Sequence, residues 1–114
     1  MSARLTSGFF VAAYLRRVAT EGAAAFLRRR GSEEAGAIFV KVDRLDGSAM
    51  LYGPAPQSAL SEDADRSFMR LTVEGAKSTD VEERLAKELR FDPDLWIIET
   101  EDRQGRCFLD LVEP

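Results

Sequence analysis

Residues 37–57 limit what this chain can fold into more than any other segment does. Ile38, Val40 and Val42 alternate with other side chains, which is the two-residue period of a strand with one buried face. The reversal that follows contains Gly47, a residue that adopts the positive φ of a tight hairpin loop without steric cost. The segment therefore predicts a β-hairpin.

The returning strand of this hairpin spans residues 49–52 and is stopped by Pro54 and Pro56, because proline cannot donate to a strand ladder. Tyr52 and Gln57 bracket this end of the hairpin. One hypothesis is that the segment docks a partner, since the prolines keep it extended and a tyrosine suits an interface. The alternative is that Tyr52 is half buried and the prolines only end the strand and protect an edge.

A helix is expected before the hairpin. Thr6 or Ser7 can cap it, it begins near Phe9, and Gly22 is placed to end it. Its apolar side chains fall at i, i+3, i+4 and i+7, a single buried stripe made by Val11, Tyr14, Leu15 and Val18. Residues 23–27 either continue this helix or start a strand, and the interruption at Gly22 favours a short strand ending at residues 28–30.

The second half predicts a strand over residues 67–73 and a helix opened by Thr79. Thr79 and Glu82 have the spacing of a capping box, and Pro93 stops the helix. Residues 95–100 are rich in strand formers on both faces and are expected at the centre of the sheet. A turn at residues 102–105 then leads to a last strand over residues 107–112.

These elements predict an α+β fold of one domain over residues 1–114: a mainly antiparallel sheet of about five to six strands with two helices packed on it. The two helices are expected to cover one face and leave the other to water or a partner. The candidate core positions are Tyr14, Phe26, Phe39, Leu51, Phe68, Leu85, Leu89, Trp96 and Ile98.

Composition excludes several kinds of site. The chain has no histidine and a single cysteine, Cys107, so His-dependent triads, zinc sites and internal disulfides are ruled out. The spacing of Asp63, Asp65, Ser67 and Glu74 matches part of a calcium loop, but Phe68 stands where such loops need glycine. We expect no cofactor and no metal.

The charge is unevenly distributed. Residues 1–44 carry +4 and residues 45–114 carry −8, which gives the net charge of −4. The run Arg28, Arg29 and Arg30 fits a solvated strand end with local ion pairs better than a phosphate-binding patch, and no nucleic-acid partner is expected. Without an apolar segment of about 20 residues or a signal peptide, the expected location is the cytoplasm.

Four segments resemble those of a known family: residues 13–17, 35–47, 51–57 and 90–96. The chain is similar along nearly its whole length to a family of small bacterial proteins, mostly alphaproteobacterial, classed as a domain of unknown function. The resemblance implies one compact domain and carries over no functional residue.

Three function classes remain open. A non-enzymatic interaction or regulatory module is favoured, with a protein partner or a second copy docking on an open sheet face. The second class is a small-molecule or anion binder that uses Arg28, Arg29, Arg30 and the Tyr52–Gln57 loop. An enzyme built on carboxylates is third, because its candidates occupy turn-like positions where solvation is the ordinary role; they are Asp43, Asp46, Asp92 and Asp94.

Overall fold

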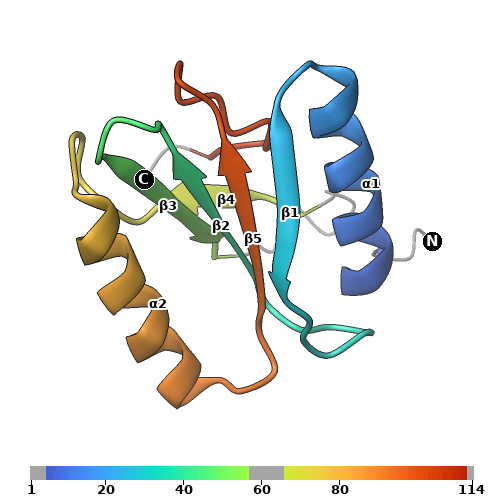
Figure 1. The fold of residues 1–114 in the computed structure, drawn as a ribbon. Coiled ribbons are helices and arrows are strands. Elements are labelled where there is room, and N and C mark those ends of the chain that lie inside the picture. The colour runs from blue at the N-terminus through green and yellow to red at the C-terminus, as the bar shows by residue number, and fades with distance from the viewer. Residues whose placement is uncertain (1–4, 57–65, 113–114) are drawn as a thin grey trace.

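The computed structural model describes residues 5–56 and 66–112, which form two helices and a five-stranded sheet (Figure 1). In space the strands follow the order β1-β5-β2-β3-β4. Three of the four pairings are antiparallel, and β2 pairs with β5 in parallel. The predicted α+β class is confirmed. The elements in chain order are α1 (Ser7–Thr20), β1 (Ala24–Arg29), β2 (Ile38–Asp43), β3 (Ala49–Pro54), β4 (Phe68–Arg70), α2 (Ser78–Phe91) and β5 (Trp96–Glu101).

The predicted hairpin is formed by β2 and β3, in a register that pairs Val40 with Tyr52 and Asp43 with Ala49. Gly47 has a φ of 91° in the connecting loop, as the reversal requires. Leu45 also has a positive φ, 64°, a conformation that few residues other than glycine adopt. Strand β3 runs to Pro54, two residues beyond the predicted range of 49–52.

The segment after α1 is a strand, so Gly22 does separate two elements. Gly22 has a φ of 84°, and β1 begins two residues later. Strand β1 pairs with β5 along one side only, and its register shifts between Leu27 and Arg29. Strand β5 lies between β1 and β2, which confirms its predicted central position.

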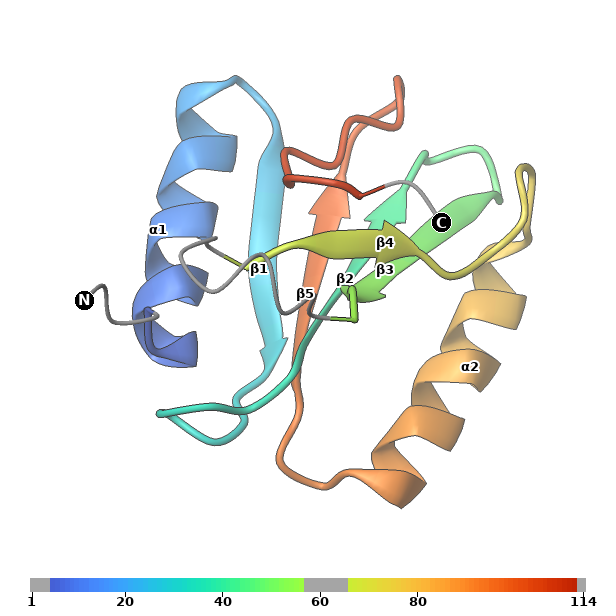
Figure 2. The same cartoon turned by 180° about the vertical axis from the view of Figure 1, so that it is seen from behind.

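The two helices lie on opposite faces of the sheet, contrary to the expectation that both cover one face (Figure 1). Side chains of β2 alternate between the two cores: Val40 packs with α1, and Phe39 packs with α2. The chain after β5 joins α1 on its face through residues 107–109, and it crosses in front of the strands in Figure 2. Each face thus has its own apolar layer.

Most of the predicted core is buried, but Phe26 is 46% exposed. It stands on the edge strand β1, and its neighbours in sequence, Ala25 and Leu27, are the ones that pack on the α1 side. Helix α2 packs against β3, which lies three strands away from β1 in the order of the sheet. Phe26 is therefore left at the margin of the α2 layer.

The prediction of a last strand over residues 107–112 is wrong. Arg106 folds back onto Asp102, with its guanidinium on Asp102 Oδ1 at 2.9 Å and its backbone N–H on Oδ2 at 2.8 Å. Phe108 then has a φ of 59°, which no strand residue adopts. Among the residues that the structure describes, a single isolated bridge, between Leu111 and Phe68 of β4, joins this segment to the sheet.

Helix α2 begins one residue before the predicted capping box. Its N-cap is Lys77, which makes no side-chain capping bond. The side chain of Glu82, predicted to bond back to the cap, instead accepts hydrogen bonds from Arg28 of β1 and Lys41 of β2. The helix ends at Phe91, as Pro93 predicts.

Within the described ranges, neither helix has the length and apolar character to cross a membrane.

Candidate functional site

The three consecutive arginines have different partners from one another. Arg28 binds Glu82 and Glu99, with its Nη1 at 2.8 Å and 3.0 Å from their carboxylates. Arg29 donates to the carbonyl oxygen of Leu95 at 2.8 Å. Arg30 lies over the ring of Trp96, with 5.3 Å to its centroid. Their guanidinium groups do not converge, so an anion at this run would have to compete with existing contacts.

A charged network joins β1, β2 and α2 around Glu82. Lys41 is 4% exposed, and its ammonium lies 2.7 Å from Glu82 Oε2. Arg28 binds both oxygens of the same carboxylate. These hydrogen bonds, with the Arg28 contact as the largest cause, lower the pKa of Glu82 to about 2. The network keeps a nearly buried lysine paired, which is the condition for burying such a charge at all.

Tyr52 lies in the core rather than at the surface. It is 4% exposed, its hydroxyl donates to Met50 Sδ at 3.4 Å, and burial raises its pKa to about 12. Gln57, its predicted companion, lies outside the described residues. Tyr52 and Arg28 stand on strands three positions apart, about 14 Å in a sheet, so the structure does not bring the two predicted groups together.

Three of the four candidate catalytic carboxylates accept hydrogen bonds within turns, and Asp94 contributes its backbone N–H to one of these bonds. Asp43 Oδ1 accepts from the N–H of Leu45, Asp46 Oδ1 from Ser48, and Asp92 Oδ1 from the N–H of Asp94. The hydrogen bonds from Ser48 lower the pKa of Asp46, which is the opposite direction from that of a general acid.

Metal ligands do not gather in the part of the chain that the structure describes, where no three Cys, Asp or Glu side chains cluster as a metal site. Asp63 and Asp65 of the calcium-like spacing lie outside that part.

A hollow of about 460 Å³ opens beside β4, between the chain that follows this strand and the end of the C-terminal segment. We call it the β4 groove; it is lined by Tyr52, Arg70, Leu71, Thr72, Val73, Leu111 and Val112. Val73 is 74% exposed and Leu111 50%. Arg70 lies at the groove and its guanidinium is 3.5 Å from the Glu74 carboxylate. Apolar side chains with a charged rim are the arrangement found at protein interfaces.

The sequence offered no signal for this groove, apart from Tyr52. The sequence pattern predicts one strand that contains Leu111 and Val112 and another that ends at Val73. Only the turn at residues 102–110 brings the two segments together, and that turn depends on the Asp102–Arg106 contact rather than on any periodic pattern.

Comparison with known proteins adds a family. The model for the protein family of unknown function DUF1491 matches residues 5–110. The chain belongs to this family. A solution structure of a protein from A. tumefaciens is 42% identical, with a TM-score of 0.84 over 98% of both chains.

Two structures of a DUF1491 family protein from Caulobacter crescentus CB15 are also similar. The crystal structure is 33% identical, with a TM-score of 0.77 over 97% of this chain and 100% of the other. The NMR structure is 36% identical, with a TM-score of 0.79 over 98% and 100%. No curated protein matches the chain. The DUF1491 family has no assigned function.

Proposed function

We propose that this DUF1491 chain is a non-enzymatic interaction module that docks a protein partner in the β4 groove. The observation that carries the proposal is the exposure of Val73 and Leu111 on one groove. Exposed apolar side chains that share a concave surface are a common mark of a protein interaction site. The proposed partner presents apolar side chains to this groove.

The backbone around the groove indicates how the partner is held. The outer edge of β4 is already bonded to the C-terminal segment, with Phe68 N–H on the carbonyl of Asp110 and Val112 N–H on the carbonyl of Phe68, both at 2.9 Å. A partner therefore binds through side chains in the groove rather than by adding a strand at this point. Tyr52 keeps a role in this proposal as part of the groove wall.

The ionisable groups support a non-catalytic role. Among the described residues, the carboxyl groups with shifted pKa values are Asp46, Glu82 and Asp102, and hydrogen bonds lower all three. A general acid needs a shift in the other direction. The proposal includes a cytoplasmic location, where the lone thiol of Cys107 stays reduced.

Site-specific photo-crosslinking in the native host tests this proposal. Val73 is replaced by a photoreactive phenylalanine, and the matched control places the same group at Phe91. Phe91 is 79% exposed and is the last residue of α2, about 20 Å along the helix axis from the first residue of this helix. We expect one discrete adduct from position 73 and none from position 91. Its mass distinguishes a second copy from a different protein.

A second variant links the adduct to the groove. Leu111→Asp introduces a charge on the opposite wall and should remove the adduct, while the melting temperature stays near that of the unchanged chain because Leu111 is half exposed. An equal adduct at positions 73 and 91, or one that survives Leu111→Asp, would exclude the groove as the docking site.

A further inference from the structure

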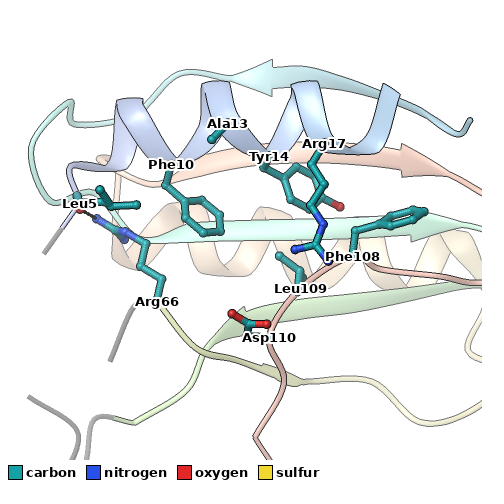
Figure 3. Close-up of a pocket in the computed structure, with 9 residues that line it drawn as sticks. All are labelled: Leu5, Phe10, Ala13, Tyr14, Arg17, Arg66, Phe108, Leu109 and Asp110. Carbon is teal, nitrogen blue, oxygen red and sulfur yellow. Dashed lines mark hydrogen bonds between the residues drawn. The ribbon is translucent and has the colours of Figure 1, made fainter. Parts of the chain in front are cut away.

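A second hollow lies between α1 and the C-terminal segment, on the same face of the sheet as α1. We call it the α1 pocket; its volume is about 200 Å³, and Figure 3 shows its lining residues. Phe10, Ala13, Tyr14 and Arg17 of α1 stand at i, i+3, i+4 and i+7, so they form one stripe along the helix. Phe108, Leu109 and Asp110 form the facing wall, and Leu5 and Arg66 close one end.

Both ends of the facing wall are fixed to the rest of the fold. The hydroxyl of Tyr14 donates to the carbonyl of Cys107 at 2.7 Å, and the carbonyl of Asp110 accepts from the N–H of Phe68. Between these anchors Phe108 has a φ of 59°. A non-glycine residue in this region is strained, and such strain is concentrated at functional sites. The wall of the pocket is thus held in a fixed conformation by its two anchors.

Aromatic rings line the pocket and are themselves held. Phe10 packs on Phe68, with ring centroids 5.5 Å apart, and stacks on Tyr14 at 6.4 Å. The ring of Phe108 lies under the guanidinium of Arg106 at 5.0 Å. The pocket is below the roughly 300–1,000 Å³ of sites for drug-sized ligands and holds about seven waters' worth of volume. It fits a body the size of one ring.

Two guanidinium groups add positive charge to this apolar slot. Arg66 is 8% exposed and is oriented by hydrogen bonds from its Nη2 to Ser7 Oγ at 2.8 Å and to the carbonyl of Leu5 at 3.1 Å. Arg17 extends from α1 towards Leu109 (Figure 3). Within the described residues Arg17 takes part in no ion pair. Arg17 and Arg66 are the basic residues of the lining, and Asp110 is its acidic residue.

We propose that the α1 pocket binds a small organic anion with a ring-sized apolar body and a carboxylate. The body lies between Phe10, Tyr14 and Phe108, and the carboxylate meets Arg17, whose planar guanidinium matches a carboxylate with two hydrogen bonds. The α1 pocket shares no lining residue with the β4 groove. The ligand proposal therefore does not depend on the proposed protein partner.

Amide-resolved NMR titration with sodium benzoate tests the proposal, and neutral benzamide is the matched probe of the same shape. Benzoate should give saturable shifts centred on Ala13, Tyr14, Arg17 and residues 108–110. Benzamide should bind at least tenfold more weakly, because it lacks the charge that Arg17 recognises. Equal affinity of the two probes would overturn the anion assignment, and shifts centred elsewhere would overturn the site.

Two variants separate the charge from the cavity. Arg17→Gln should weaken benzoate binding at least tenfold, whereas Arg16→Gln, on the neighbouring exposed position of α1, should leave it unchanged. Ala13→Leu should fill the slot and abolish binding while the amide spectrum stays that of a folded chain. If Arg17→Gln binds benzoate as tightly as Arg16→Gln does, the proposal is wrong.

Discussion

Tyr14 and Tyr52 place two phenols in the same apolar layer, but only Tyr14 has strong polar partners. Its hydroxyl donates to the carbonyl of Cys107 at 2.7 Å and lies 2.7 Å from Thr100 Oγ1. Since the phenol has one proton to give, Thr100 is the donor of the second bond. The partners of the Tyr52 hydroxyl are sulfur atoms, Met50 Sδ at 3.4 Å and the thiol of Cys107, and sulfur is a weak hydrogen-bonding partner. Tyr14 therefore ties together α1, β5 and the segment that shapes both hollows.

This difference predicts unequal effects of removing each hydroxyl. Tyr14→Phe should lower the free energy of unfolding by about 1–3 kcal/mol, because the carbonyl of Cys107 and the buried hydroxyl of Thr100 lose their partner. Tyr52→Phe, the matched variant, should cost less than about 1 kcal/mol. Urea unfolding of both variants measures the difference. Equal losses would mean that the Tyr14 bonds contribute no more than the Met50 contact.

At the scale of elements, patterns that are complete within one segment predicted the structure well. The hairpin of β2 and β3 and the limits of α1 follow from alternation, apolar spacing and the glycines at positions 22 and 47. Thr6 caps α1 as expected, accepting from the N–H of Phe9 at 3.2 Å. These features need no information from the rest of the chain.

Elements whose residues have distant partners were predicted less well. Glu82 has the spacing of a capping box, yet Lys41 and Arg28 hold it, because leaving a nearly buried ammonium unpaired costs more than the roughly 1 kcal/mol of a cap. The segment after β5 alternates like a strand, but the Asp102–Arg106 contact and the turn at Phe108 break it. Its misassignment also hid the β4 groove and the α1 pocket.

The Glu82 network predicts how stability depends on acid. The pKa of Glu82 falls from its usual 4.5 to about 2 in the folded chain, so its carboxylate stabilises the fold above pH 4.5. This contribution is lost as the pH drops from about 4.5 to 2. Because the Glu82 side chain is 40% exposed, solvent screening limits the contribution to about 1 kcal/mol.

Chemical denaturation at a series of pH values measures this contribution. Glu82→Gln should be less stable than the unchanged chain at pH 7, and the difference should shrink towards pH 2. Glu83→Gln, on the exposed side of α2, is the control and should keep the original pH dependence. A Glu82→Gln difference that stays constant from pH 7 to pH 2 would show that the ionised carboxylate is not what stabilises the network.

At the scale of the whole molecule, the placement of the helices on two faces could not be derived from the sequence. Both helices have one apolar stripe, and β2 and β5 are apolar on both sides, so each stripe could pack on either face. The parallel pairing of β2 with β5 depends on the long connection through β3, β4 and α2. The predicted binding residues were separated for the same reason, since strand order alone decides that Arg28 and Tyr52 lie apart.

This architecture predicts where the molecule opens first. Strands β5, β2 and β3 are bonded on both sides and lie between two apolar layers, whereas β1 is an edge strand with a register shift and β4 has three residues. Breaking β5–β2 pairing requires opening both layers together, so amides of Val40, Val42 and Ile98 should exchange only through global unfolding.

Native-state hydrogen exchange should show the bonded amides of β1 exchanging at least tenfold faster than these central amides, with a weaker dependence on denaturant. Protection in β1 equal to that in β2 would instead require the Arg28–Glu82 contact, which connects β1 to α2, to join the edge strand to the same cooperative unit. In that case Glu82→Gln should restore faster exchange in β1 alone.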